Sequence, residues 1–287
     1  MSGLNEGNMQ IAKTIKLFIG GDFPRTESGR SFPVNQHKSQ KVYAHLCRAS
    51  RKDLRNAITA AQAAQLGWAA KSAYNRGQIL YRMAEMMEGK RPEFAEILSK
   101  TLGYTAIKSQ KGINEAIDAF VYYAGWADKY QQVIGAVNPV SGPHHNFTTP
   151  EAVGVIGHLA DTEFDLGALV SQIAAMIVSG NTVVTLMSIQ GGASLAPLAE
   201  VFATSDLSKG VVNLLTGDLD ELASQFGSHM ELQSLNCQVK DSKVLASLKE
   251  AAANNMKRVV PPTAAKMDLE SLLSFVEYKT VWHPIGH

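Results

Sequence analysis

The second half of this sequence alternates short apolar runs with helix-length segments, and this alternation limits the possible folds more than any other feature. Each apolar run has the length of one buried strand. Parallel strands joined by crossover helices produce this pattern, because the helices cover both faces of the sheet. We therefore predict an α/β fold with a Rossmann-like parallel sheet flanked by helices. The expected strands are Val153–Gly157, Thr182–Leu186, Val211–Leu215 and Leu232–Leu235, and the expected helices are Leu166–Val178, Leu195–Thr204, Leu219–Phe226 and Ser242–Asn255.

The first half of the sequence is predicted to be mainly helical. Ser50, followed by Asp53 three residues later, is close to the pattern of a capping box at a helix start. Apolar residues then recur at helical spacing in four successive segments, which indicates helices packed on a core. Two strands are expected before them, at Leu17–Asp22, where a turn follows, and at Val42–Cys47.

Residues 131–150 differ from the segments on either side. They combine prolines and glycines with β-prone stretches such as Gln132–Ile134, which predicts an extended hairpin rather than more helix. Near the C-terminus, Tyr278–Trp282 is a further β-prone stretch. We expect these two segments to form a small β element separate from the parallel sheet.

Composition excludes several classes of function. The formal net charge is +1, so we expect no nucleic-acid partner and no acidic membrane surface as a partner. The two cysteines, Cys47 and Cys237, are too few for a disulfide framework and lack the spacing of a zinc site. The first 16 residues are mixed polar, unlike a signal peptide, and the apolar runs are shorter than a membrane span. A cytoplasmic protein is the simplest expectation.

The order of several motifs resembles the aldehyde dehydrogenase superfamily. The resemblance spans about Leu17 to Val259, and it implies that most of the chain corresponds to the cofactor-binding half of such an enzyme. The segments that carry it are Leu17–Asp22, Gly29–Val34, Gly67-Trp68, Asn75–Leu80, Tyr122–Lys129, Val153–Gly157, Ser179–Val184, Gly210–Asn213 and Asn255–Val259.

The C-terminal stretch Tyr278–Trp282 resembles the last strand of that family. In the family a whole catalytic domain separates this strand from the segment matched by Lys257–Val259, whereas here only about Val260–Glu277 intervenes. The resemblance therefore implies a nucleotide-binding-like domain at residues 1–130 and 150–262, an oligomerisation arm at residues 131–149 and 276–287, and an absent catalytic domain. Among family members, the non-catalytic second module of two-module aldehyde dehydrogenases is the most similar arrangement.

Residues that the family uses for chemistry are replaced in this sequence. Its nucleophilic cysteine belongs to the absent domain, and Glu163 occupies the position of the asparagine that stabilises the oxyanion. Leu186 and Ile189 occupy the positions of the lysine and glutamate that hold the cofactor ribose. Val239 replaces the glycine of the turn near the pyrophosphate, and Pro262 replaces the general-base glutamate. We accordingly expect no catalytic residue, no metal and no NAD cofactor.

Two smaller clusters allow alternative functions. Asp161, Glu163 and Asp165 alternate along the chain and could share one face of an extended segment, as a hard cation requires, although a solvated loop is the simpler interpretation. His144-His145 is interpreted as a surface pair. Around the former cofactor cleft, the side chains expected to close it are Phe164, Leu186, Met187 and Ile189.

These inferences leave two main hypotheses for function. The first is a non-catalytic structural or regulatory subunit that assembles through the β arm, as a homo-oligomer or with a complete aldehyde dehydrogenase. The alternative is a diverged NAD(P)-binding oxidoreductase that retains residual nucleotide binding. A new ligand or metal site at the acidic cluster is a third and weaker hypothesis.

Overall fold

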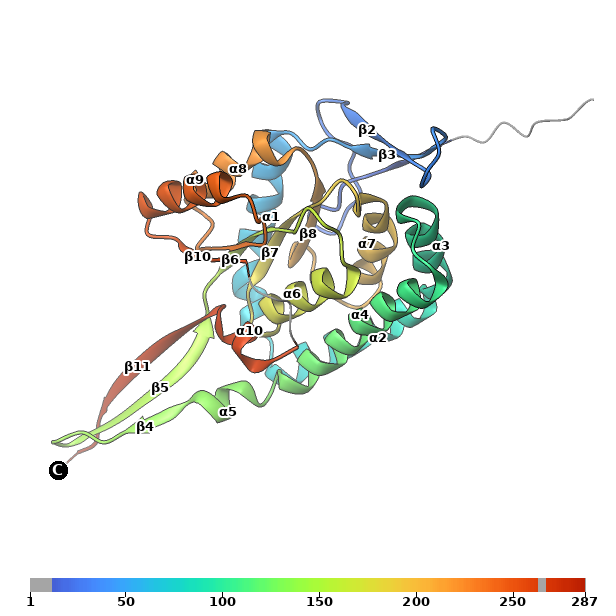
Figure 1. Cartoon of the computed structure of the whole chain (residues 1–287). Helices are drawn as coiled ribbons and strands as arrows, with labels where there is room; N and C mark the ends of the chain where they lie inside the picture. Colours follow the sequence, from blue (N-terminus) through green and yellow to red (C-terminus); the bar gives the residue numbers. More distant parts are fainter. Residues whose placement is uncertain (1–11, 263–266, 287) are drawn as a thin grey trace, which may run out of the picture.

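A five-stranded parallel sheet forms the centre of the computed structural model, which describes residues 12–262 and 267–286 (Figure 1). Its strands lie in the order β10-β9-β6-β7-β8, and every neighbouring pair is parallel. The chain runs outward from β6 through β7 and β8 and then returns to place β9 on the other side of β6. The predicted α/β fold is thus confirmed. The strand bounds are β6 Val155–Leu159, β7 Thr182–Met187, β8 Val212–Thr216, β9 Ser234–Cys237 and β10 Arg258–Val260.

The first strand of the sheet begins two residues later than the sequence indicates. Gly154 has φ +132°, a conformation outside the extended range of an ordinary side chain. Its carbonyl accepts a hydrogen bond from the Thr182 N–H at 3.1 Å. The Gln233 side chain accepts one from the Val155 N–H at 2.8 Å. Gly154 therefore forms the bend that leads into β6 instead of belonging to it.

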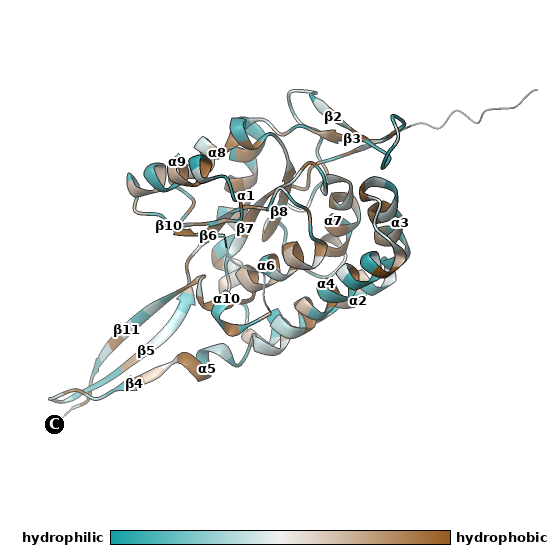
Figure 2. Cartoon of the chain, viewed as in Figure 1, coloured by the Kyte–Doolittle hydropathy of each residue, from teal (hydrophilic) through white to brown (hydrophobic). Residues whose placement is uncertain are grey.

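Helices cover both faces of this sheet and form two apolar cores. On one face, α6 (Leu166–Val178) packs against β7, while α7 (Leu195–Ala203) follows the short 3₁₀ turn η1 (Gly192–Ser194) and packs against β8. On the other face lie α1 (Arg51–Ala69), α8 (Leu219–Ser228) and α9 (Ser242–Ala253). Apolar residues of these helices pack with the strands in the two cores, and Figure 2 marks the hydrophobic positions along each ribbon in brown.

Three further helices lie outside this layer: α4 (Ala106–Trp126) and α2 (Ala73–Gly89) pack on α6, and α3 (Arg91–Leu102) packs on α4 and η1. The sequence of α6 is apolar around nearly its whole circumference. This suits its position, since α4 covers the side of α6 that does not face the sheet. Within residues 12–262 and 267–286, no helix combines the length and the apolar character needed to cross a bilayer.

The N-terminal part begins with a three-stranded sheet of β1 (Lys13–Ile15), β3 (Val42–Cys47) and β2 (Ser31–Asn35). The predicted capping box is confirmed, since the Ser50 hydroxyl accepts from the Asp53 N–H and the Asp53 carboxylate accepts from the Ser50 N–H. The strand expected at residues 17–22 consists instead of two isolated bridges, from Phe18 to β8 and from Ile19 to Asp22 across a tight turn.

A second three-stranded sheet projects from the body of the molecule (Figure 1). We call this antiparallel sheet of β11 (Val276–Pro284), β5 (His144–Ala152) and β4 (Ala136–Asn138) the β arm. The expectation of β structure at residues 132–134 is wrong, because they belong to the short helix α5 (Tyr130–Ile134). Tyr130 is 1% exposed, so its burial in the body keeps this segment helical despite its β-prone residues. A last short helix, α10 (Leu269–Leu273), precedes β11.

Candidate functional site

A cavity of about 200 Å³ lies where β6, β7 and β8 end. In open parallel sheets, ligands bind outside the carboxyl ends of the strands, so this position is the natural candidate for a binding site. We call the cavity the apolar cleft. Its lining residues are Leu159, Ala160, Thr162, Leu186, Met187, Ser188, Ile189, Gln190, Gly217 and Leu219.

The side chains expected to close the former cofactor cleft do so only in part. Leu186 and Met187 are buried in its wall, and Ile189 is 39% exposed beside its mouth. Phe164 is not among the lining residues. Its ring packs on Gly191, where an added Cβ would lie 1.8 Å from a ring carbon, and its carbonyl accepts from the Tyr104 hydroxyl at 2.9 Å. The cleft therefore remains open.

The loop after β6 is joined to the loop after β9 by ion pairs. The Nζ of Lys240 lies 3.0 Å from an Asp161 carboxylate oxygen and 3.1 Å from one of Glu163. These two carboxylates raise the pKa of the Lys240 ammonium. Glu163, expected from the sequence at the position of the family's oxyanion asparagine, is an exposed ion-pair partner and not a hydrogen-bond donor.

The acidic cluster does not form a cation site in the described part of the chain. The carboxylates of Asp161 and Glu163 are both ion-paired with Lys240. Asp165 instead caps α6 by accepting a hydrogen bond from the Ala168 N–H at 2.9 Å. Among the residues that the structure describes, no group of three or more His, Cys, Asp or Glu side chains could hold a metal ion. The His144 ring instead packs edge to face on Trp282 in the β arm.

Two of the replaced positions lie away from the cleft. Val239 is 2% exposed and packs in the core shared by α1 and α8. The N–H of the preceding Gln238 donates to the Leu159 carbonyl at 2.9 Å, which extends the pairing of β9 with β6. Pro262 follows β10, and because β10 is the edge strand, β9 and β6 separate it from β7. The structure therefore brings together Leu186 and Ile189 but not Val239 and Pro262.

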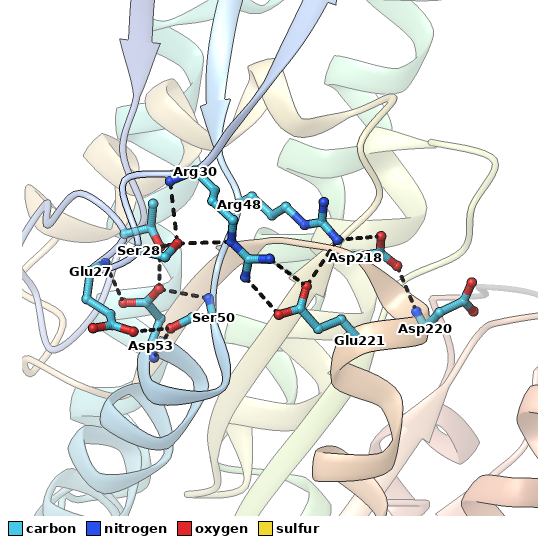
Figure 3. Close-up of polar contacts among 10 residues, drawn as sticks. Glu27, Ser28, Arg30, Arg48, Ser50, Asp53, Asp218, Asp220 and Glu221 are labelled. Atoms are coloured by element: carbon cyan, nitrogen blue, oxygen red, sulfur yellow. Dashed lines mark hydrogen bonds and ion pairs between the residues drawn. The ribbon is translucent and has the colours of Figure 1, made fainter.

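A charged network fixes the loop between β8 and α8, which forms one wall of the cleft (Figure 3). Arg48 donates to Asp218 and to Glu221, each at 3.1 Å. Arg30 reaches the same Glu221 with two N–H groups, at 2.7 and 3.2 Å. The Glu221 carboxylate raises the pKa of Arg30, and Arg30 in turn lowers the pKa of Glu221. Sequence reasoning missed this network, because its partners lie far apart along the chain.

A buried histidine directly precedes Leu159, a residue that lines the cleft. This histidine, His158 of β6, is fully buried. Its Nε2 lies 2.9 Å from the Gln172 amide oxygen of α6, and its Nδ1 lies 3.3 Å from the Thr185 hydroxyl of β7. Burial lowers the pKa of this imidazole to about 4, although the Gln172 hydrogen bond opposes the shift. At neutral pH the ring is therefore an uncharged link between strand and helix.

Both cysteines are buried, which bears on any nucleophilic chemistry. Cys47 is 2% exposed at the end of β3, and Cys237 is 0% exposed at the end of β9. Burial is the main cause that raises the pKa of the Cys237 thiol. A raised pKa keeps a thiol protonated, whereas nucleophilic attack needs an accessible thiolate.

Comparison with known proteins identifies what the fold resembles. The sequence model described as "Aldehyde dehydrogenase family" matches residues 23–267. Aldehyde dehydrogenase 1A1 of Mesocricetus auratus is 29% identical over 96% of this chain and 57% of its own length. Benzaldehyde dehydrogenase, mitochondrial, of Antirrhinum majus is 30% identical over 85% of this chain and 46% of its own length. The chain thus spans about half the length of these relatives.

A solved structure corrects the expectation about the cofactor. The NAD⁺ complex of an aldehyde dehydrogenase from Bacillus cereus is 26% identical and superposes with a TM-score of 0.80 over 86% of this chain and 50% of that one. The prediction of no nucleotide cofactor is contradicted by this finding, because the family fold binds NAD. That prediction relied on the replaced contacts to the ribose and pyrophosphate and on the replaced catalytic positions, and it gave too little weight to the retained sheet.

Proposed function

Because this chain belongs to the aldehyde dehydrogenase family, we propose that it is a non-catalytic member that assembles with another chain of the family through its β arm. The partner is a second copy or a complete aldehyde dehydrogenase. The observation that carries the proposal is an exposed apolar row on the arm.

This apolar row runs across all three strands of the β arm. Phe147 of β5 is in register with Val137 of β4 on one side and with Val281 of β11 on the other. Val137 is 70% exposed, and the other two side chains are only partly buried. A projecting ribbon with an uncovered apolar row loses water-exposed hydrocarbon area when a partner packs on it.

The opposite face of the β arm carries polar side chains that hold the ribbon together, beside the exposed Trp282 and Tyr278 of β11. The Asn138 amide donates to the Asn146 side chain at 2.6 Å and to the Thr148 hydroxyl at 2.9 Å. The hydroxyls of Thr148 and Thr280 lie 2.9 Å apart. These contacts link the three strands without using the apolar row. The arm therefore offers that row to a partner while keeping its own shape.

The edges of the β arm offer a second mode of contact. In the order β11-β5-β4, both β11 and β4 are edge strands, and among the described residues no strand pairs with the outer side of either. Exposed strand edges pair readily with another chain by adding a strand. A long edge such as that of β11 (Val276–Pro284) supports such an addition.

The burial of both cysteine thiols and the ion pairing of Glu163 support a non-catalytic role. Both thiols are buried and Glu163 is engaged with Lys240. Covalent aldehyde oxidation needs an accessible thiolate next to hydrogen-bond donors for the oxyanion, and the described residues do not combine the two at the cleft.

Light scattering of the purified protein tests the proposal. We expect a mass greater than that of one chain, either alone or after mixing with a complete aldehyde dehydrogenase from the same cell. Val137→Asp places a charge in the apolar row at a side chain that is 70% exposed, so it should release the partner without unfolding the chain. The matched control is Ile107→Asp, on an 84% exposed side chain of α4 away from the arm, which should leave the mass unchanged. A monomer under both conditions would overturn the proposal.

Nucleotide binding at the apolar cleft is a second candidate function. It is favoured by the position of the cleft at the carboxyl ends of β6, β7 and β8, on a fold whose Bacillus cereus relative was solved with NAD⁺. The apolar walls suit a flat base, and Ser188 and Gln190 provide a hydroxyl and an amide, whereas Leu186 and Ile189 provide no hydrogen bond for a ribose. Under this second candidate, calorimetric titration with NAD would show saturable binding, and no heat of binding at millimolar NAD would exclude it.

A further inference from the structure

The size of the apolar cleft limits what it can hold. Its volume is about 200 Å³. Apolar protein cavities of about 150 Å³ lined by leucine, isoleucine and phenylalanine bind benzene, whereas drug-sized ligands need about 300 Å³ or more. The cleft therefore matches a single ring with one or two small substituents.

The walls of the cleft select against charge. Hydrocarbon side chains from Leu159, Leu186 and Leu219 surround it, and Met187 adds a thioether, which makes favourable contacts with aromatic rings. Among the described residues, no Asp, Glu, Lys or Arg lines the cleft. A charged ligand would lose its hydration there without gaining a partner of opposite charge.

The mouth of the cleft has both apolar and polar groups. Ile189 is a large side chain that remains 39% exposed there, so a ligand would cover hydrocarbon that now faces water. The Ser188 oxygen accepts from the Gly191 N–H at 3.3 Å, which leaves the Ser188 hydroxyl hydrogen available to a ligand oxygen. One hydroxyl or carbonyl substituent on the ring would be satisfied at this position.

Close packing and an ion pair hold the loop wall of the cleft in place. At Gly217 an added Cβ would lie 2.8 Å from a Leu222 methyl carbon and 3.3 Å from one of Leu186, so the loop backbone packs closely on the wall. The ion pair between Arg48 and Asp218 holds the same loop. A loop held by such contacts spares a ligand the free-energy cost of ordering it.

From these four observations we infer that the apolar cleft binds a small, uncharged, single-ring aromatic molecule. The inference concerns a ligand site and does not rest on assembly through the β arm. It assigns to the carboxyl edge of the sheet a ligand class that lacks both the sugar and the phosphates of a nucleotide.

Methyl-resolved NMR of the full chain tests this inference with phenol as the probe. We expect phenol to shift the Met187 and Ile189 methyl signals in a saturable way. Benzoate has the same ring with a carboxylate and should bind at least about tenfold more weakly, because its charge has no partner in the cleft. Absence of a saturable shift with phenol, or equal binding of benzoate, would overturn the inference.

Variants locate the binding. Ile189→Glu places a carboxylate at the partly exposed mouth, where it is tolerated by the fold, and should weaken phenol binding at least about tenfold. Ile107→Glu makes the same change at a remote exposed position on α4 and should leave phenol binding as in the parent chain. If both variants bind phenol equally well, the ligand lies elsewhere and the assignment is wrong.

A titration with adenosine separates this inference from nucleotide binding. Adenosine carries a ribose that the cleft walls do not match, so it should bind more weakly than phenol. Tighter binding of adenosine at the same methyl groups would overturn the single-ring assignment and favour a nucleotide. Neither result alters the light-scattering test of the β arm, so the two proposals fail independently.

Discussion

Arg48 and Asp218, which are 170 positions apart in the sequence, lie 3.1 Å apart between a guanidinium nitrogen and a carboxylate oxygen. Arg48 directly follows β3, and Asp218 is the N-cap of α8. This pair therefore connects the N-terminal sheet to the loop that forms one wall of the apolar cleft. The Arg48 guanidinium also lies over the Phe32 ring, 5.2 Å from its centroid, which orients it further.

Arg48→Gln should destabilise the protein by about 1 kcal/mol, because Asp218 and Glu221 then lose a shared, partly buried cation. Urea unfolding measures the change. Arg82→Gln is the matched control, since Arg82 pairs with Asp206 where both side chains are largely exposed, and its effect should be close to zero. Equal losses in the two variants would show that the network adds nothing beyond a surface ion pair.

Local signals explain why much of the fold could be predicted from the sequence. The capping box of Ser50 and Asp53 and the alternation of β and α segments both depend on neighbouring residues. The prediction failed at Gln132–Ile134, where burial of the adjacent Tyr130 outweighs β propensity. It also placed β6 two residues early, because the turn at Gly154 depends on contacts with distant residues.

The candidate site could be predicted less completely. The resemblance to the family predicted Leu186 and Ile189 at the cofactor cleft, and both line the apolar cleft. The ion pairs of Lys240 with Asp161 and Glu163 were not predicted, since a sequence does not show which distant cation meets an acidic cluster. For the same reason the Arg48 network was missed, and Pro262 was grouped with cleft residues although the strand order separates them.

We expect the buried imidazole of His158 to make the folded protein less stable in acid. Burial lowers the pKa of this imidazole to about 4, against 6.5 for its ordinary value. As pH falls from 6.5 to about 4, His158 becomes protonated in the unfolded chain but stays neutral in the folded chain. The free energy of unfolding therefore decreases as pH falls across this window. The loss from this group is on the order of 3 kcal/mol.

Urea unfolding at a series of pH values checks the role of His158. His158→Gln removes the titrating ring, so its unfolding free energy should depend less steeply on pH between 4 and 6.5 than that of the parent. His283→Gln changes an exposed histidine of β11 and should keep the parent slope. If His158→Gln keeps the full slope, another group causes the acid sensitivity.

Thiol labelling should report two unreactive cysteines. Cys47 and Cys237 are both buried, so reaction with an aromatic disulfide reagent requires the structure to open and should be at least about a hundredfold slower than in denaturant. Leu66→Cys introduces a thiol at a position that is 79% exposed, and this thiol should react at once. A parent thiol that reacts as fast as the introduced one would contradict the non-catalytic assignment.

Asn181 joins the β arm to the body through a buried amide. Its Oδ1 accepts from the Gly154 N–H at 2.9 Å, and its Nδ2 donates to the Phe275 carbonyl at 2.8 Å, just before β11 begins. Asn181 is 0% exposed, so these groups have no access to water when the side chain is removed. The Met176 carbonyl and the Ser179 hydroxyl also lie within hydrogen-bond distance of Nδ2, so its two hydrogens are shared among three acceptors.

Asn181→Ala should therefore cost about 3 kcal/mol of unfolding free energy, because it leaves buried backbone groups without partners. Asn56→Ala, at an exposed position of α1, should cost close to nothing. The same variant loses the hydrogen bond to the Phe275 carbonyl, directly before β11. Backbone hydrogen exchange in β11 (Val276–Pro284) should therefore accelerate more than exchange in the central strand β7. The mass measured by light scattering should fall in the same variant if the arm mediates assembly. Unchanged exchange in β11 would show that pairing with β5 alone holds the strand in place.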